Sequence, residues 1–229
     1  MGDEPIVIYG NPASQPSRAI MWFCHENSIP FEFKMVDLGK GENKTKEFVD
    51  LNPNKTVPVL NDNGFVLYES AAILSYLARR FKVKDHWYPQ DPRARGLVDQ
   101  YLHWHHTHLR KGAASLFFYA MIAPLFDGSR DFAEEKKAAI LDLETSLQII
   151  DARLANTQFI AGDEISIADM QAATEFTQHV LANTYDFTGY ANVTRWLGVL
   201  KEMPAYAKTH TPVAELFDQL RASSKLRSS

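Results

Sequence analysis

The spacing of apolar positions changes repeatedly over the first 81 residues. Short apolar or alternating runs at residues 5–9 and 31–36 predict strands, whereas residues 14–27 and 69–81 carry apolar side chains at the steps of a helix face. Residues 57–60 and 65–67 flank a turn-rich tetrad whose Asn63-Gly64 pair favours a tight hairpin. With a short helix expected at residues 44–51, the order β-α-β-α-β-β-α predicts a mixed sheet with helices packed against it.

The pattern lapses at residues 83–92 and is helical afterwards. We expect a linker there, whose Trp87 and Tyr88 pack on a neighbouring surface. Helices are then predicted at residues 93–121, 133–154, 166–184, 192–203 and 212–222, followed by a frayed end at 223–229. Ser166 and Asp169 match the capping-box pattern at one helix start. The predicted organisation is an α/β domain at 1–82, a linker at 83–92 and an all-helical domain at 93–229.

Charge and cysteine content narrow the function classes. The 229 residues carry a net charge of −4, which provides no electrostatic reason to expect a nucleic acid or an anionic membrane as partner. No apolar run approaches the roughly 20 residues of a membrane span. Cys24 is the single cysteine, so an intrachain disulfide is excluded. Because the first residues also lack an apolar signal region, we expect a soluble cytoplasmic protein.

The most informative stretch joins the first predicted strand to the first predicted helix. Ser14 stands just before Pro16 at this joint, a combination typical of a helix N-cap and first turn. A helix start has unpaired N–H groups and a partial positive charge, which favour an anion. Our hypothesis is that Ser14 holds a thiolate; the alternative is that it only caps the helix. Since Ser14 and Ser17 occupy both ends of the four-residue window, a Cys-x-x-Cys exchange site is excluded there. Cys24 is expected to be a buried structural thiol.

Several motifs in a fixed order give the chain a family resemblance. The sequence resembles the cytosolic glutathione transferases, and among them the theta class. The resemblance implies a thioredoxin-like, glutathione-binding N-terminal domain, an all-helical domain that binds the electrophile, and a homodimer with the site near the dimer cleft. The motifs that carry it cover nearly the whole chain: Ser14-Gln15-Pro16-Ser17-Arg18, Ile29-Pro30-Phe31-Glu32, Val36-Asp37-Leu38, Asn52-Pro53, Val57-Pro58-Val59-Leu60, Tyr68-Glu69-Ser70, Ala72-Ile73-Leu74, Trp87-Tyr88-Pro89-Gln90-Asp91 and Ile165-Ser166-Ile167-Ala168-Asp169.

The resemblance implies how glutathione is held. Ser14 would donate to the glutathione sulfur, with Tyr9 as the rival activator. Glu69 would pair with the γ-glutamyl amine, and Ser70 with the helix N–H groups would receive its carboxylate.

The cysteinyl part and the glycine end involve a second group of residues. A cis peptide before Pro58 would turn the Val57 backbone towards the cysteinyl part. Lys55 or Thr56 would meet the glycine carboxylate. The chain departs from animal theta proteins at Asn43 and Thr56, where they tend to carry histidine and lysine; Asn43 can still hydrogen-bond, and Lys55 is one residue away.

The electrophile site is expected on the long helix after the linker. Its candidates are Arg110, Phe117, Phe118 and Met121. Arg110 would stabilise charge near the sulfur or, alternatively, would belong with Lys111 to a solvated face. Four histidines on the same segment form two pairs that point in different directions, so we expect no metal and place them at the cleft or the dimer contact: His103, His105, His106 and His108.

These expectations together predict a theta-like glutathione transferase that joins glutathione to a small hydrophobic electrophile, without a metal. Two alternatives remain open at this point. One is a glutathione-binding or structural protein of the same fold without turnover, and the other is peroxide reduction or dehalogenation with glutathione.

Overall fold

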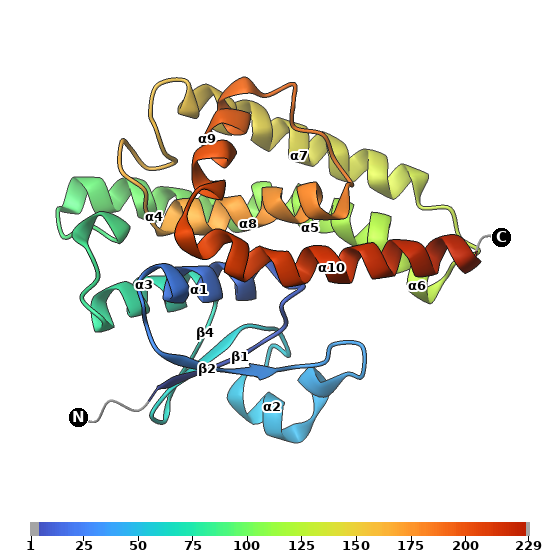
Figure 1. Cartoon of the computed structure of the whole chain (residues 1–229), viewed down its shortest axis with the longest axis horizontal. Helices are drawn as coiled ribbons and strands as arrows, with labels where there is room; N and C mark the ends of the chain where they lie inside the picture. Colours follow the sequence, from blue (N-terminus) through green and yellow to red (C-terminus); the bar gives the residue numbers. More distant parts are fainter. Residues whose placement is uncertain (1–4, 228–229) are drawn as a thin grey trace.

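A four-stranded sheet at one end of the molecule carries a larger layer of helices on one side (Figure 1). The computed structural model describes the backbone of residues 5–227 and the side chains of residues 5–219. The strand order is β2-β1-β3-β4, with β1 parallel to β2 and antiparallel to β3, and β3 antiparallel to β4. The predicted mixed sheet is therefore confirmed. The strands are β1 (Ile6–Gly10), β2 (Phe31–Met35), β3 (Val59–Asp62) and β4 (Phe65–Tyr68).

Short-range signals account for the elements of the sheet domain. The β3–β4 hairpin turns at Asn63 and Gly64, which both adopt positive φ, the conformation that an Asn-Gly turn accommodates. The Val57–Pro58 peptide is cis, as the family resemblance implies. The helical elements of this domain are α1 (Gln15–Glu26), η1 (Glu42–Lys44), α2 (Lys46–Leu51) and α3 (Ser70–Arg80).

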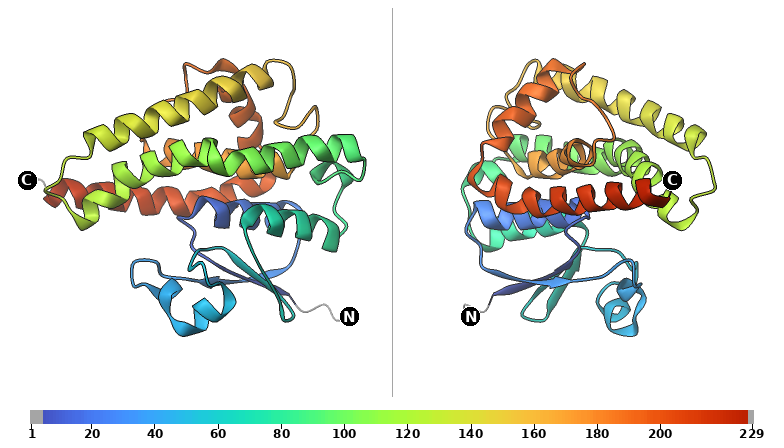
Figure 2. Two further views of the ribbon diagram at one scale, coloured as in Figure 1. Left: turned by 180° about the vertical axis from the view of Figure 1, so that it is seen from behind. Right: turned by 45° about the vertical axis from the view of Figure 1, so that its right-hand side comes forward.

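The two faces of the sheet pack against different helices. Alternation along β1 sends Ile6 and Ile8 into the main core with α1 and α3, which lie between the sheet and the remaining helices (Figure 2). Tyr9 points to the other face, where it packs with Phe48 of α2. A side chain on β1 thus lies either in the interior of the molecule or beside α2.

The segment after α3 is packed rather than free. Within it, η2 (Asp85–Trp87) brings Trp87 to 3% exposure, with its ring edge-on to Phe23 at 5.4 Å. The Tyr88 hydroxyl donates to Asp99 at 3.0 Å. The expectation that these two aromatic residues pack on a neighbouring surface is confirmed.

The second part of the chain is helical, as predicted. Its main core is continuous with that of the sheet domain. The capping box at Ser166 and Asp169 is confirmed, and the Asp169 carboxylate also accepts from the Trp196 indole at 2.9 Å. No helix within residues 5–227 is long and apolar enough to cross a membrane. The helices are α4 (Pro92–Thr107), α5 (Leu109–Phe117), η3 (Phe118–Ile122), α6 (Ala123–Phe126), α7 (Ala133–Leu154), α8 (Ile167–Ala182), α9 (Ala191–Lys201) and α10 (Pro204–Arg227).

The single helix predicted over residues 93–121 is wrong. The backbone breaks at His108, whose φ of −119° and ψ of −88° are not helical, and the chain then continues as α5 and as the π-helical turn η3. Beyond the break, α5 packs closely on α7 at Gly112. A Cβ atom at this position would collide with the backbone of Leu143, so the close packing requires a glycine. The break re-aims the second half of the segment, which contains the predicted electrophile residues.

The last helix is also longer than predicted. It begins at Pro204 instead of Pro212 and continues to Arg227, so the frayed end expected at 223–227 is wrong; positions 228–229 lie outside the described residues. Its first turns lie along α1, where Tyr206 and His210 meet the Trp22 ring edge-on at 5.4 and 5.1 Å. These aromatic contacts stabilise the turns of the helix that precede the interior proline, Pro212.

Candidate functional site

Ser14 caps α1 at the carboxyl end of β1. Its backbone is extended (φ −81°, ψ 122°), and its hydroxyl oxygen accepts from the Ser17 N–H at a long 3.5 Å. The side chain is only partly buried. A hydroxyl that accepts a hydrogen bond still has its own hydrogen to donate, so Ser14 can cap the helix and donate to an anion at once.

The loop before Ser14 is held by side chains from several directions. The Asn11 side chain bonds the Ala13 N–H at 2.9 Å and the Val36 carbonyl at 3.0 Å. The Arg18 guanidinium donates to the Pro12 carbonyl at 2.9 Å. Burial lowers the pKa of Arg18 to about 10, so this side chain stays charged near neutral pH. Ser14 therefore sits at the end of a loop whose backbone has little freedom.

Tyr9, the rival activator, and Cys24, the single cysteine, both have side chains placed away from this loop. Tyr9 packs beside α2 on the sheet face opposite α1, with the Lys34 ammonium 5.5 Å from its ring centroid. Cys24 is fully buried inside α1, and burial raises the pKa of its thiol far above the usual range. The geometry thus favours Ser14 over both.

The sheet register gathers the predicted glutathione residues at one edge. Tyr9 of β1 pairs with Val59 of β3, which pairs in turn with Tyr68 of β4. Because β3 runs opposite to its two neighbours, the segment that enters β3 emerges at the same edge as the segments that leave β1 and β4. The pieces that meet there are residues 11–14, residues 55–58 and residues 69–70.

Glu69 and Ser70 form the start of α3. Glu69 has φ 71° and ψ 109°, a conformation that costs a non-glycine residue of order 1–3 kcal/mol and is concentrated at functional sites. Its side chain is exposed, whereas Ser70 is buried and its hydroxyl oxygen accepts from the Gln171 amide at 2.9 Å. The strained residue thus presents a carboxylate beside a helix start.

Residues 55–57 are held from within the sheet domain. The Asn43 amide donates to the Lys55 carbonyl at 2.7 Å, and the Asn52 amide donates to the Thr56 carbonyl at 2.8 Å. Lys55 has a φ of 59° and an exposed side chain, and Thr56 is exposed as well. Asn43 therefore acts through the backbone of Lys55, and the Oδ1 atom of Asn43 is buried without a hydrogen-bond partner among the described residues.

Arg110 belongs to a buried ion pair instead of a solvated face. Its guanidinium lies 2.5 Å from the Glu175 carboxylate, which is 1% exposed. Burial raises the pKa of Glu175, but Arg110 and His105 outweigh this and hold it well below its usual range. Lys111, by contrast, forms an exposed ion pair with Asp142 at 2.9 Å. Only Lys111 fits the solvated face that was the alternative for this pair.

The aromatic candidates separate into two positions. Phe117 and Met121 belong to a small apolar cluster that includes Ala13, next to Ser14. Phe118 is 45% exposed and packs on Tyr119 instead. The same cluster contains Val213 and Phe217 of α10, whose ring lies 5.3 Å from that of Phe117. The sequence analysis missed both residues of α10, although their four-residue spacing is the available signal.

The four histidines do not form a cluster. His105 is fully buried with its Nδ1 atom 3.1 Å from the Tyr101 hydroxyl, so its predicted place at a cleft or dimer contact is wrong. His103 and His106 line a hollow of about 410 Å³ together with Glu69 and Asp99. Among the residues that the structure describes, no group of three or more His, Cys, Asp or Glu side chains could hold a metal ion. The absence of a metal remains a prediction.

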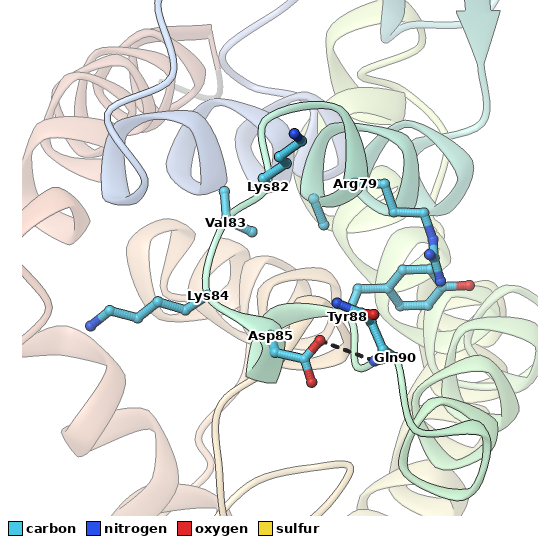
Figure 3. A pocket seen from close by; sticks show the side chains of 8 residues that line it. Arg79, Lys82, Val83, Lys84, Asp85, Tyr88 and Gln90 are labelled. Atoms are coloured by element: carbon cyan, nitrogen blue, oxygen red, sulfur yellow. Dashed lines mark hydrogen bonds between the residues drawn. The ribbon is translucent and has the colours of Figure 1, made fainter.

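A second hollow of about 410 Å³ lies at the far end of α3, beside the linker (Figure 3). The guanidinium groups of Arg79 and Arg95 lie 5.0 and 5.4 Å from the centroid of the Tyr88 ring. The Asp85 carboxylate accepts from the Gln90 N–H at 3.1 Å, and Lys84 extends away from both. This hollow is remote from the α3 N-terminus and contains none of the predicted site residues.

Comparison with known proteins agrees with this geometry. The family model described as glutathione S-transferase, N-terminal domain, matches residues 4–79, and the model of the C-terminal domain matches residues 110–204. The chain is 41% identical over 190 residues to glutathione S-transferase theta-1 of Rattus norvegicus, which covers 82% of this chain and 79% of the relative.

Solved structures of glutathione transferases also resemble this chain. The human glutathione S-transferase T1-1 in its apo form superimposes with a TM-score of 0.86 at 37% identity, covering 93% of this chain and 91% of the other. A human theta-class glutathione transferase in complex with the glutathione conjugate of 1-menaphthyl sulfate gives a TM-score of 0.88 at 32% identity, covering 96% and 92%.

Proposed function

The chain belongs to the glutathione S-transferase family, and on that premise we propose how its own residues carry out glutathione conjugation: Ser14 donates a hydrogen bond to the glutathione thiolate, which attacks a small hydrophobic electrophile. The proton of the thiol leaves to solvent, a carbon–sulfur bond forms, and the electrophile either loses a leaving group or accepts the electron pair as an addition product. The observation that carries the proposal is the register that gathers Ser14, Val57 and Glu69 at one sheet edge.

One hydroxyl at a helix N-terminus can supply the free energy needed to lower the pKa of the glutathione thiol. A free thiol has a pKa of about 8.5, so only a few per cent is thiolate at neutral pH. Lowering that pKa by about two units requires roughly 2.7 kcal/mol of selective stabilisation. A hydrogen bond to a charged group contributes about 1.5–3 kcal/mol, and a helix N-terminus about 0.3–1 kcal/mol. Ser14 at the start of α1 supplies both.

The remaining contacts would orient glutathione along the same edge. Glu69 pairs with the γ-glutamyl amine, and Ser70 with the first N–H groups of α3 receives the neighbouring carboxylate. The Val57 backbone pairs with the cysteinyl part in the manner of an added strand. Lys55, with Thr56, meets the glycine carboxylate, and Asn43 supports it by fixing the Lys55 carbonyl.

The electrophile would lie between this edge and the helices. In this proposal residues 1–82 bind glutathione, residues 83–92 link, and residues 93–229 provide the electrophile site and the dimer contact. The apolar cluster next to Ser14 supports Phe117 and Met121 as its wall and adds Val213 and Phe217. Arg110 contributes positive charge from the rim, although Glu175 engages part of it. Phe118 has the weakest support, because its ring lies outside the cluster.

We also propose a cytoplasmic homodimer. The hollow bordered by α3 and α4, with Glu69 and His103 on its wall, supports a partner surface beside the glutathione site. Sedimentation of the purified chain measures the oligomeric state, and a monomer at micromolar concentration contradicts this part.

Ser14→Ala tests the chemistry, with Ser166→Ala as the matched control, because both substitutions remove the side-chain cap of a buried helix. We expect Ser14→Ala to lower kcat/KM for a model electrophile by about 10–100-fold at neutral pH and to raise the thiol pKa of bound glutathione, the size following from one lost charge-assisted hydrogen bond. Ser166→Ala should leave both quantities unchanged. Unchanged conjugation in a folded Ser14→Ala protein contradicts the proposal.

The two alternatives are separated in the same samples. If glutathione binds but no electrophile in a panel reacts, the chain is a binding protein of this fold. Turnover of organic hydroperoxides or halogenated substrates with glutathione, measured alongside, shows whether peroxidase or dehalogenase activity accompanies conjugation.

A further inference from the structure

The buried helix α8 carries an unusual number of polar side chains. It runs through the middle of the helical layer and contacts α1, α3, α4, α5 and α10 (Figure 1). Gln171, Glu175 and Gln178 are each at most 1% exposed. They stand at positions i, i+4 and i+7, which face one side of a helix. Burying polar groups costs free energy unless each finds a hydrogen-bond partner, so the partners show what this polar stripe does.

Gln178 reaches the loop that carries Ser14. Its amide nitrogen donates to the Ala13 carbonyl at 3.2 Å, and its amide oxygen accepts a short hydrogen bond from Arg18. Arg18 in turn donates to the Pro12 carbonyl at 2.9 Å and to the Thr174 carbonyl of α8 at 3.3 Å. Both carbonyl groups before Ser14 are therefore held, directly or through Arg18, from α8.

Gln171 reaches the start of α3. Its amide nitrogen donates to the Ser70 hydroxyl oxygen at 2.9 Å, between two side chains that are both buried. This bond occupies the acceptor side of the hydroxyl and leaves its hydrogen free to point elsewhere. The same helix thus contacts two separate parts of the proposed glutathione site.

We infer that α8 positions the glutathione site through two independent contacts: Gln178, with Arg18, sets the direction of the Ser14 hydroxyl, and Gln171 sets the direction of the Ser70 hydroxyl. Both glutamines are positioning residues, since neither would touch the substrate. The inference rests on the proposed roles of Ser14 and Ser70. Two helical turns, about 10 Å, separate Gln171 from Gln178, a distance at which two substitutions usually act independently.

If the two contacts are independent, substitutions at Gln178 and Gln171 should change different quantities. Ser14 acts on the thiol, so loosening its loop should change thiol ionisation and leave the affinity for glutathione with a protonated thiol nearly unchanged. Ser70 acts on the γ-glutamyl carboxylate, so loosening its hydroxyl should change glutathione affinity and leave thiol ionisation unchanged. A general loss of packing in α8 would not separate the two quantities in this way.

The experiment compares Gln178→Met, Gln178→Glu and Gln171→Met with a control, Thr177→Val. Methionine keeps the approximate volume of glutamine without its amide, and Gln178→Glu keeps an acceptor for Arg18 while replacing the donor to Ala13 with a carboxylate oxygen. Thr177 is 1% exposed on the same helix, and the control substitution keeps its shape. Two readouts apply to the full-length enzyme. One is the thiol pKa of bound glutathione, from thiolate ultraviolet absorbance against pH, and the other is the glutathione Kd from calorimetry at a pH below that pKa, where the bound thiol is protonated in every variant. Thermal unfolding establishes that each variant is folded.

We expect both Gln178 variants to lower the thiolate fraction of bound glutathione by about 3–10-fold below the thiol pKa, with Kd within about twofold. Gln171→Met should raise the glutathione Kd by about 5–10-fold, the scale of one misdirected hydrogen bond to a carboxylate, with the thiol pKa unchanged. Thr177→Val should change neither. In a Ser14→Ala background, Gln178→Met should produce no additional change in thiolate fraction, because its effect passes through Ser14.

Failure of the inference is distinguishable from failure of the proposed function. If Ser14→Ala shifts thiol ionisation and the Gln178 variants do not, the positioning inference is overturned and the role of Ser14 stands. Equal changes in both readouts for all α8 variants, the control included, overturn it as well. If Ser14→Ala itself leaves the thiol pKa unchanged, the proposed function falls and takes the role of Gln178 with it.

Discussion

The Ser14 loop and the Lys55–Val57 segment meet at one sheet edge but are held in different ways. The Ser14 loop is bonded to Arg18 and Gln178, which are fully buried between α1 and α8. The segment at residues 55–57 is bonded to Asn43 and Asn52 of the same small domain, and the side chains of residues 55 and 56 are exposed.

This difference decides how many properties of the protein a substitution at each segment should change. The thiol end of the proposed site depends on polar contacts inside the helical layer, where an unpaired group costs several kcal/mol. The glycine end depends on exposed groups, where a lost contact costs little and changes nothing else. Substitutions on the buried side should therefore affect folding, acid sensitivity and chemistry together, and substitutions at residues 55–57 should affect affinity alone.

The largest expected effect is at the buried ion pair. Arg110→Met leaves the Glu175 carboxylate in the interior without its main partner and should cost about 3–5 kcal/mol in the free energy of unfolding. Urea unfolding at neutral pH measures this loss. The double variant Arg110→Met/Glu175→Gln should recover much of it, since no uncompensated charge is left; a double variant as unstable as the single one contradicts the explanation.

Acid should weaken the buried side next. Burial and the nearby Arg18 lower the pKa of His210 to about 2, and burial lowers that of His179 to about 4. In the unfolded chain each histidine takes up a proton near its ordinary pKa of about 6.5, so below that pH the unfolded state binds more protons and stability falls. For His210 the loss reaches about 2 kcal/mol near pH 5.

The variant His210→Phe should remove that part of the acid sensitivity. A phenyl ring can keep the contacts with Trp22 and Tyr206 while it cannot take up a proton. Unfolding free energies measured at neutral pH and near pH 5 should differ by about 2 kcal/mol less than in the parent chain. An unaltered pH dependence in His210→Phe would contradict the assignment of this acid sensitivity to His210.

A smaller effect is expected at the first turn of α8. Ser166→Ala removes the hydroxyl that accepts from the Ala168 N–H and should cost about 0.5–2 kcal/mol. Because the Gln171 and Gln178 contacts lie further along the helix, glutathione affinity and the thiol pKa should stay as in the parent. Thermal unfolding and calorimetry check both statements, and a shifted thiol pKa would mean that the cap and the site are coupled.

The smallest effect is expected at Lys55. Lys55→Ala removes an exposed charge and should raise the glutathione KM by about 2–5-fold, the range of a solvent-exposed ion pair, with stability and the pH profile unchanged. Raising the salt concentration should shrink the difference. Lys201→Ala, an exposed lysine at the end of α9, is the control. A change in the pH profile of Lys55→Ala would remove the contrast between the two ends of the site.

Local signals predicted most of the elements correctly because their causes are local. The Asn63-Gly64 turn, the capping box at Ser166 and the alternation along β1 each depend on neighbours within a few residues. The break at His108 is different. Residues 93–121 have a continuous helical pattern, and the redirection is accompanied by the close contact of Gly112 with α7, which lies some 30 residues further along the chain.

The partners of buried polar residues could not be predicted from the sequence either. Arg110 next to Lys111 looks the same in sequence whether it faces solvent or Glu175, 65 positions away. Gln171 and Gln178 gave no signal, because a glutamine in a helix is ordinarily an exposed residue. Pro212 was misplaced as a helix start, since the contacts of Tyr206 and His210 with Trp22 that stabilise the preceding turns are tertiary.

The sequence by itself determined the order of strands and helices along the first domain, the hairpin, the capping box at Ser166 and the position of Ser14 between β1 and α1, because hydrophobic period and turn chemistry act over a few residues. Only the tertiary structure decided what holds that serine. Gln178 of α8 is 165 positions from Ala13 of the Ser14 loop and 160 positions from Arg18, which holds the loop with it. Hydrogen bonds between buried polar groups at such separations leave no periodic pattern in either segment.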